Sequence, residues 1–235
     1  MRIAILGYGK MGKTIEEILL ERGHEIVLKA DGHHQATKDD LKNIDVAIEF
    51  SQPKAAYHNI SLCFDNRIPV VSGTTGWHDK MVEIKNRCID EGQAFFYASN
   101  FSIGVNIFFA MNKRLAELIN QYSEYKVNIK EIHHRNKLDA PSGTAISLAE
   151  GIMATQKNYK QWDLNEQGED IITIESERIG DTPGTHIVTF ESDVDKIEIK
   201  HESKSRKGFA YGAVLAAEFL HGKTGYYGMK DLLNL

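Results

Sequence analysis

The fold of this chain is decided near its N-terminus, by the stretch Ile3-Ala4-Ile5-Leu6-Gly7-Tyr8-Gly9-Lys10-Met11-Gly12. A short apolar run leads directly into a G-x-G-x-x-G motif, and a helical pattern begins at the end of the motif. The first glycine permits a tight turn, the second lets backbone N–H groups approach a pyrophosphate, and the third lets helix and strand pack closely. The pyrophosphate would then lie at the positive end of the helix. Glycines in such a motif can also serve a turn alone, but a strand before and a helix after favour a nicotinamide cofactor, NADH or NADPH.

Four more apolar runs follow this first strand and alternate with helical patterns. They cover residues 25–30, 46–50, 69–72 and 94–97, and they are rich in Val, Ile and Phe. Such alternation is typical of βαβ units and a parallel sheet whose strands are buried on both faces. We therefore expect an α/β fold with a Rossmann-type dinucleotide-binding domain.

The pattern changes after Phe101, where a second domain is expected. An apolar stripe predicts a long helix; its residues are Val105, Phe108, Phe109, Leu115 and Ile119. A strand-like stretch at 125–134 and a helix from about Ser142 follow. Alternating segments at 171–179, 185–191 and 196–201 predict an antiparallel sheet with turns at 181–184 and 192–195. We expect residues 1–103 and 206–235 to form the dinucleotide-binding domain, and residues 104–205 to form an α+β substrate-binding and oligomerisation domain with a mixed or antiparallel sheet.

The second sheet is expected to be half exposed, because Ile197 and Ile199 alternate with charged residues. One interpretation is that a face of this sheet packs on a partner sheet in an oligomer. The other is that helices of its own domain cover it. The sequence leaves both open.

Composition excludes several classes of protein. The 235 residues are 42% hydrophobic and 26% charged, which is enough for a buried core, and the net charge of -5 argues against a nucleic-acid partner. The two cysteines, Cys63 and Cys88, fall in helical patterns, so we expect packing thiols in a reducing compartment. No apolar run has the length of a membrane span or a signal peptide. A cytoplasmic protein without a membrane partner is therefore expected.

Further cofactor-binding residues are expected at the carboxyl ends of the other strands, which meet at one edge of a parallel sheet. Asp31 follows the second strand, where its carboxylate can accept hydrogen bonds from the ribose hydroxyls of the cofactor. The same carboxylate would repel the 2′-phosphate of NADPH, whereas the Lys10 ammonium could pair with that phosphate. The preference between NADH and NADPH stays open. The turns after the fourth and fifth strands could hold nicotinamide and its ribose, although both could also be ordinary polar turns; their residues are Gly73, Thr74, Thr75, Ala98, Ser99, Asn100 and Phe101.

The most informative stretch is Glu131-Ile132-His133-His134-Arg135-Asn136-Lys137-Leu138-Asp139-Ala140-Pro141-Ser142-Gly143-Thr144-Ala145. It combines proton donors with an expected helix start, whose free N–H groups attract carboxylates. The two adjacent histidines point to opposite sides of a strand, so they have different tasks. The stretch predicts an acid catalyst beside an anion-binding turn; surface histidines before a capped helix are the alternative.

This stretch resembles the signature of the dihydrodipicolinate reductase family, E-x-H-H-x-x-K-x-D-A-P-S-G-T-A. The resemblance extends along almost the whole chain and includes the glycine turn, Gly73-Thr74-Thr75-Gly76, residues 100–106 and residues 209–213. It implies NAD(P)H-dependent reduction of 4-hydroxy-tetrahydrodipicolinate, a cyclic dicarboxylate, in lysine and diaminopimelate biosynthesis. It also implies a homotetramer joined through the second-domain sheet.

The resemblance also implies roles for residues of the stretch. His133 would deliver a proton and Lys137 would be the second donor, while His134, Gly143 and Thr144 would bind the substrate. Arg135 is a further cation near a substrate that carries two carboxylates.

Two departures from the family pattern put details in doubt. The glycine turn is one residue shorter than the common form and has Lys10 where arginine is frequent, which leaves cofactor preference unsettled. Thr185 stands before His186 where glutamate is frequent.

Three other interpretations are weaker. A dehydrogenase that uses a cysteine thioester would need a histidine beside Cys63 or Cys88. A non-catalytic nicotinamide sensor would not need His133 and Lys137. Metal binding is not expected, because neither His33-His34 nor His133-His134 has ligand spacing for one ion.

Overall fold

The five apolar runs of the N-terminal hundred residues form neighbouring strands of one sheet in the computed structural model, which describes residues 1–164 and 166–235. The chain divides into two compact units, Met1–Ile103 with Lys207–Leu235, and Gly104–Arg206. Each unit has its own sheet and its own core.

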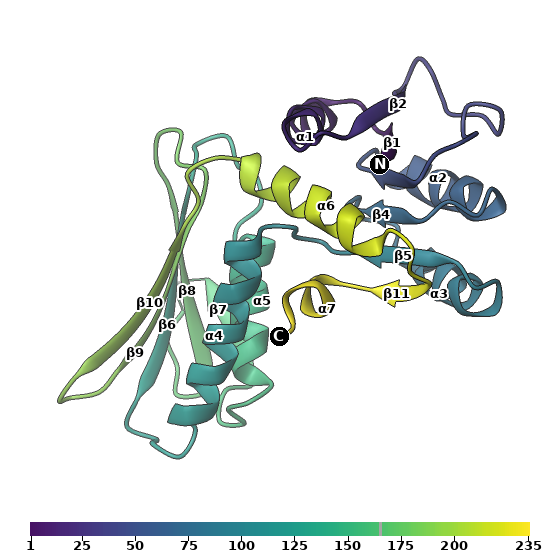
Figure 1. Ribbon diagram of the computed structural model, residues 1–235. Helices are drawn as coiled ribbons and strands as arrows, with labels where there is room; N and C mark the ends of the chain where they lie inside the picture. The colour runs from purple at the N-terminus through teal and green to yellow at the C-terminus, as the bar shows by residue number, and fades with distance from the viewer. Residues whose placement is uncertain (165) are drawn as a thin grey trace. The chain divides into compact units, whose positions relative to one another are not determined.

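The first unit is a six-stranded parallel sheet with strand order β11-β5-β4-β3-β1-β2 (Figure 1). The chain leaves β1 to one side to form β2 and returns to the other side to form β3, so the strand order reverses at β1. Its elements are β1 (Arg2–Leu6), α1 (Lys10–Glu21), β2 (Glu25–Ala30), β3 (Val46–Glu49), α2 (Pro53–Asp65), β4 (Val70–Ser72), a 3-10 turn (His78–Lys80), α3 (Met81–Asp90), β5 (Ala94–Tyr97), α6 (Lys207–Leu220), β11 (Gly225–Tyr227) and α7 (Met229–Leu233). This is the predicted Rossmann-type architecture, and the prediction is confirmed.

Helices cover both faces of this sheet, as the apolar strands require. On one face α1 and α6 pack on Ile3, Ile48 and Phe96, and on the other α2 and α3 pack on Ala47 and Phe95. Cys63 of α2 and Cys88 of α3 are free and buried in the apolar cluster between these helices and the sheet, where they act as packing thiols.

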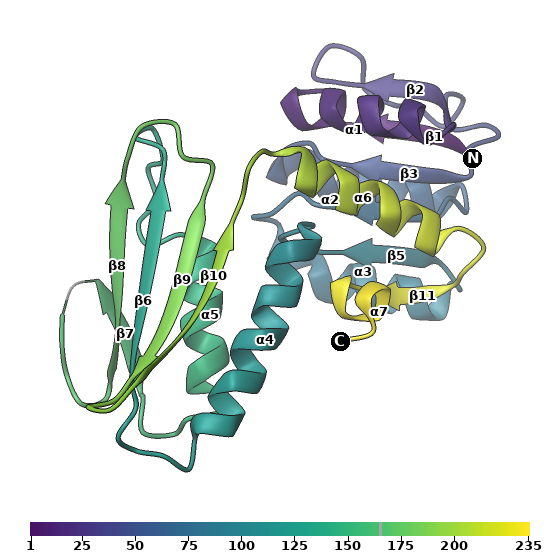
Figure 2. The same cartoon turned by 60° about the vertical axis from the view of Figure 1, so that its left-hand side comes forward.

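The second unit is a five-stranded sheet with order β10-β9-β6-β8-β7. Its elements are α4 (Ile103–Ile119, whose first residue belongs to the first unit), β6 (Lys126–His133), α5 (Gly143–Met153), β7 (Gln161–Leu164), β8 (Ile171–Arg178), β9 (Thr185–Glu191) and β10 (Lys196–Glu202). Figure 2 shows α4 and α5 on the same side of this sheet, where Phe108 and Leu148 contact Val188 and Phe190 in one apolar cluster.

The pairing in this sheet corrects one prediction. The segments at 171–179, 185–191 and 196–201 were expected to pair in sequence order, but only β9 and β10 form a hairpin. Strand β6 lies between β8 and β9, parallel to β8 and antiparallel to β9, so the sheet is mixed. Strand periodicity shows which residues share a face but not which strands are neighbours, so it missed this insertion. Two short strands, β7 and β11, were not predicted.

The apolar side of β10 faces the helices rather than the open side of the sheet. Ile199 packs against the cluster beneath α4, and it lies opposite the buried Val188. Helices of the same domain therefore cover this face at Ile199, whereas Ile197 on the same face is exposed. Among the described residues, no helix is both long and apolar enough to cross a membrane.

Candidate functional site

A cavity of about 550 Å³ lies at the strand-order reversal of the first unit. In sheets of this kind, ligands bind at that position, outside the carboxyl ends of the strands. Its lining comes from the residues after β1, β2 and β3 and from the start of α2; the residues are Gly7, Tyr8, Gly9, Ala30, Asp31, Gly32, Gln35, Ala36, Phe50, Ser51, Gln52, Lys54, Ala55, His58 and Asn59.

The three glycines of the first turn have different surroundings. A Cβ on Gly7, whose φ is +109°, would lie 2.1 Å from the carbonyl oxygen of Phe50, and one on Gly12 would lie 2.5 Å from the carbonyl oxygen of Gly7. A Cβ on Gly9 would meet nothing within 4 Å. Gly7 and Gly12 are therefore required for close backbone packing, while Gly9 keeps the start of α1 open to a ligand.

The Asp31 carboxylate lines the cavity in a fixed position. Its Oδ1 accepts hydrogen bonds from the backbone N–H groups of His33 at 2.8 Å and His34 at 2.9 Å. The N–H groups of His34 and His33 hold the pKa of Asp31 below its ordinary value. A negative charge therefore stands at the cavity wall at neutral pH.

The lining residues that follow β3 are not among the cofactor-binding residues predicted from the sequence. Phe50, Ser51 and Gln52 stand at the carboxyl end of a parallel strand, so the rule that found Asp31 would also have found them. Among the described lining residues, none comes from the other segments that were predicted to bind the cofactor, which are residues 10–12, 73–75 and 98–101.

The expected turns after β4 and β5 adjoin this cavity through Phe50. Phe50 and Phe101 have ring centroids 5.3 Å apart, and a Cβ on Gly73 would lie 2.3 Å from the Phe50 ring. The Phe101 ring is buried, and it also packs on Phe96. Phe101 therefore supports the loops from within rather than offering an exposed aromatic face.

A buried carboxylate, Glu49, joins two of these loops. It accepts hydrogen bonds from the hydroxyls of Ser72 at 2.7 Å and Thr74 at 3.0 Å, and from the backbone N–H of Ser51 at 3.1 Å. The Ser51 hydroxyl also donates to it. The Thr74 hydroxyl, expected to face the cofactor, is thus directed to Glu49.

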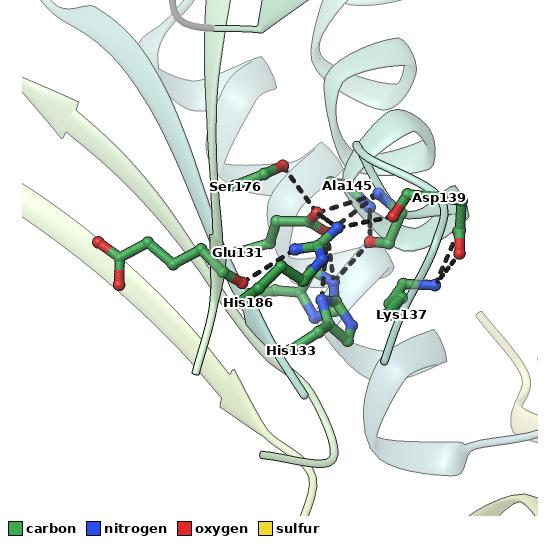
Figure 3. A network of polar contacts seen from close by, with 10 residues as sticks. Glu131, His133, Lys137, Asp139, Ala145, Ser176 and His186 are labelled. Atoms are coloured by element: carbon green, nitrogen blue, oxygen red, sulfur yellow. Dashed lines mark hydrogen bonds and ion pairs between the residues drawn. The ribbon is translucent and has the colours of Figure 1, made fainter. Parts of the chain in front are cut away.

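The stretch 131–145 forms a second polar site, within the other unit (Figure 3). His133 ends β6 with its side chain buried, while His134 is half-buried and Arg135 is exposed. The Lys137 ammonium donates to both carboxylate oxygens of Asp139 at 2.7 Å. Lys137 therefore lies in the loop between β6 and α5, as the sequence predicted.

The start of α5 has the form of an anion-binding turn. Ser142 is the N-cap, and its hydroxyl accepts a hydrogen bond from the N–H of Ala145 at 3.2 Å. Gly143 is exposed, and a Cβ there would meet nothing within 4 Å. The helix start at Gly143 and Thr144 can therefore be reached by a negatively charged group.

Glu131 lies at the centre of this site and is fully buried. It accepts hydrogen bonds from the Ser142 N–H, the Ser176 hydroxyl and the Arg178 guanidinium, at 3.1, 2.8 and 3.1 Å. Arg178 also donates to the Asp139 carbonyl at 2.6 Å. Glu131 could have been found from sequence, because it shares a face of β6 with His133; Arg178 could not, because it comes from another strand.

The imidazole of His133 lies between this carboxylate and a second histidine. Its Nδ1 is 3.4 Å from Oε2 of Glu131, and its ring centroid is 5.0 Å from that of His186. Burial lowers the pKa of His133 to about 4, although the charge of Glu131 acts in the opposite direction. Without a ligand, His133 is therefore neutral at pH 7.

Glu131, His133 and His186 also have metal-ligand spacing, since their donor atoms lie within 4.8 Å of one another. This group forms no motif in the sequence, because His186 comes from β9 whereas Glu131 and His133 come from β6. However, Arg178 already places a positive charge on Glu131. We interpret the three residues as a cluster of ionic contacts centred on Glu131.

Comparison with known proteins gives consistent matches over the whole chain. The family profile "Dihydrodipicolinate reductase, N-terminus" matches residues 1–101, and "Dihydrodipicolinate reductase, C-terminus" matches residues 104–233. The chain is 54% identical to a 4-hydroxy-tetrahydrodipicolinate reductase of Christiangramia forsetii, over 100% of this chain and 98% of the relative. It is 34% identical to the reductase of the same name from Neisseria meningitidis, with the same coverage.

A solved structure has the same fold. It is the dipicolinate-bound dihydrodipicolinate reductase of Paenisporosarcina sp. TG-14, with a TM-score of 0.80 and 24% identity, and the match covers 98% of both chains.

Proposed function

The chain belongs to the dihydrodipicolinate reductase family, and we propose that it reduces 4-hydroxy-tetrahydrodipicolinate with a nicotinamide cofactor, in the biosynthesis of lysine and diaminopimelate. The observation that carries this proposal is the polar site around Glu131, where His133, Lys137 and the start of α5 combine proton donors with an anion-binding turn. Reduction of a ring dicarboxylate needs a proton donor to complete the reduction and an anion-binding group to hold a carboxylate of the substrate.

The first unit fits a dinucleotide. The cavity offers an open helix start at Gly9, a fixed carboxylate at Asp31 and the half-buried Phe50. These features suit a pyrophosphate, a ribose and a ring, respectively. When bound, the cofactor supplies a hydride to the substrate ring.

The second unit supplies charge and protons. The substrate is a dianion, so one carboxylate can accept hydrogen bonds from the N–H groups at Gly143 and Thr144. The other can compete with Asp139 for the Lys137 ammonium. His134, half-buried beside His133, is proposed as a further contact to the substrate.

Protonation of His133 depends on the ligand. Burial favours the neutral imidazole in the free protein, whereas a nearby dianion favours the imidazolium. We propose that His133 becomes protonated as the substrate binds and delivers that proton when hydride adds to the ring, with Lys137 as the second donor. In the balanced reaction, the hydroxylated ring, one NAD(P)H and one proton give tetrahydrodipicolinate, NAD(P)⁺ and one water.

For the cofactor, we propose a preference for NADH, with NADPH accepted more weakly. The ionised Asp31 at the cavity wall would repel a 2′-phosphate. Lys54 and His58 of α2 line the same cavity and can offset part of this repulsion.

We also propose a homotetramer that joins through the open face of the second sheet. This face carries the half-buried Ile132 and Ile187 beside the ion pair of Lys130 and Glu177, at 2.6 Å. Light scattering should give four times the chain mass of 26.5 kDa, and Ile187→Glu should give a smaller species. A single-chain mass for the unaltered protein would contradict the tetramer.

Two buried, free cysteines suit a reducing compartment, so we propose that the protein acts in the cytoplasm. Cell fractionation with an activity assay tests this location.

The reaction itself is tested by a coupled assay. Dihydrodipicolinate synthase generates the unstable substrate in place, and oxidation of NADH or NADPH is followed by absorbance. Cofactor oxidation that requires the synthase supports the proposal. Its absence, with folded protein and active synthase, would overturn it.

A further inference from the structure

A row of buried polar side chains crosses the second sheet beneath α5, and its centre has no role in the reaction described above. Glu131 on β6 lies directly opposite His186 on β9 and beside Ser176 on β8. The exposed fractions of Glu131 and His186 are 0% and 4%. Burying an ionised group costs free energy, so a carboxylate at this depth requires hydrogen-bond or ionic partners that offset this cost.

The partners of Glu131 keep it ionised. Burial alone would raise its pKa, but His186, whose Nε2 lies 3.7 Å from Oε2, and the hydrogen bonds from Ser142 and Ser176 outweigh burial and hold the pKa well below its ordinary range. Arg178 adds a charge-assisted hydrogen bond to Oε1 at 3.1 Å. The carboxylate is therefore a fixed negative charge at neutral pH.

One side of this carboxylate faces the proposed proton donor. Oε2 of Glu131 is 3.4 Å from Nδ1 of His133, and that nitrogen has no hydrogen-bond partner among the described residues. On the other side of the ring, Gly184 leaves room, since a Cβ there would lie 3.1 Å from Nε2. A small rotation of the ring would complete a hydrogen bond from Nδ1 to Glu131 and fix the imidazole with Nε2 facing away from it.

The same carboxylate holds the proposed anion-binding turn. Both of its oxygens lie 3.1 Å from the backbone nitrogen of Ser142, which donates to them, and the Ser142 hydroxyl shares a hydrogen bond of 3.0 Å with Nε2 of His186. Glu131 and His186 thus fix the N-cap that precedes Gly143 and Thr144. One buried pair connects the proton donor to the substrate-binding turn.

We propose that Glu131 and His186 are positioning residues of the reductase site: Glu131 orients His133 and stabilises its imidazolium form, and the pair together hold the helix start that binds a substrate carboxylate. This inference rests on the proposed function. It predicts two separable effects, one on kcat through His133 and one on KM through the turn at Gly143.

The test compares Glu131→Gln with Glu150→Gln, in the unaltered chain and in His133→Gln. Glu150 is a matched control, because it is exposed on α5 of the same unit and loses the same charge. In the unaltered chain, Glu131→Gln should lower kcat by about tenfold or more and raise KM for the ring dicarboxylate, while KM for the cofactor stays the same. Glu150→Gln should change none of these.

The double variant distinguishes positioning from general damage. If Glu131 affects turnover through His133, then Glu131→Gln should change kcat by less than about twofold in the His133→Gln background, and KM should still rise. An equal loss of kcat in both backgrounds would overturn the proposal.

If circular dichroism shows that Glu131→Gln does not fold, Ser176→Ala provides a milder test, because it removes one hydrogen bond from Glu131. This variant should lower kcat/KM by about threefold. An unchanged kcat/KM would count against the positioning role of Glu131.

A readout without turnover separates this inference from the proposed function. The charged groups that act on His133 are Glu131, His186, Lys137 and Arg178. Glu131→Gln removes the negative one, so the titration of His133, followed by ¹⁵N NMR, should move to lower pH. Weaker calorimetric binding of pyridine-2,6-dicarboxylate is expected as well. If the unaltered chain shows no reductase activity, the proposed function fails, whereas an unmoved His133 titration and unchanged dicarboxylate affinity would overturn the positioning roles.

Discussion

The Thr74 hydroxyl donates a hydrogen bond to the buried Oε1 of Glu49 at 3.0 Å and so ties the loop after β4 to the end of β3. Ser72 and Ser51 complete the donor set of the same carboxylate. The two loops next to the proposed cofactor cavity are thus held by one acidic side chain.

Replacing this carboxylate should loosen both loops. In Glu49→Gln an amide N–H₂ would face hydroxyl donors, so we expect the free energy of unfolding to fall by about 1 to 3 kcal/mol and the Kd for NADH to rise. Urea unfolding and cofactor fluorescence measure the two effects. Glu21→Gln, on the exposed end of α1, is the control. Unchanged stability and affinity would remove Glu49 from this role.

Asp31 should control the choice between cofactors. Asp31→Asn removes the negative charge at the cavity wall, so the ratio of kcat/KM for NADH to that for NADPH should fall by about tenfold. Asp39→Asn removes an equal charge at an exposed position nearby in the chain and should leave the ratio unaltered. A ratio that does not respond to Asp31 would refute the proposed basis of the preference.

Gly9 and Gly12 should respond differently to alanine. Gly12→Ala brings a methyl group against the Gly7 carbonyl, so it should lower the melting temperature. Gly9→Ala meets open space, so the protein should keep its stability but bind NADH about tenfold or more weakly, because the methyl group obstructs the helix start. Thermal unfolding and cofactor titration of both variants provide the comparison. Normal affinity in Gly9→Ala would place the pyrophosphate elsewhere.

Lys137 should affect turnover rather than cofactor binding. As a proposed proton donor and substrate contact, its loss in Lys137→Ala should lower kcat by about a hundredfold and leave the Kd for NADH unchanged. Lys157→Ala, an exposed lysine of the same unit, should behave like the unaltered chain. Near-normal turnover of Lys137→Ala would exclude it from the mechanism.

His133 should make stability depend on pH. Its pKa is about 4 in the folded chain against an ordinary value of 6.5, because burial disfavours the charged ring. Between these two values the unfolded chain binds a proton that the folded chain does not, so this contribution to stability is present above pH 6.5 and is lost as the pH falls toward 4. His133→Gln should therefore lose less stability than the unaltered chain between pH 7.5 and pH 5 in urea unfolding. His221→Gln, which changes an exposed histidine, should follow the unaltered chain; equal losses in all three would contradict the assignment.

The sequence by itself determined the local elements and the chemistry they carry. The glycine turn predicted the first βαβ unit, the apolar runs predicted the parallel sheet, and the stretch 131–145 placed His133, Lys137 and the Ser142 N-cap around the end of one strand. These features depend on residues close together in the chain, where turn geometry, periodicity and helix capping act directly.

Only the tertiary structure decided which strands are neighbours. The insertion of β6 between β8 and β9 places Glu131 opposite His186 and next to Ser176, although these residues are about fifty positions apart in the sequence. Alternation along a strand specifies its buried face but not its partner, because every strand of the sheet has the same period of two. For the same reason, strand periodicity could place Glu131 beside His133 but could not identify its partners from other strands. The sheet pairing surrounds Glu131 with the hydrogen-bond donors that allow a carboxylate to remain charged in the core.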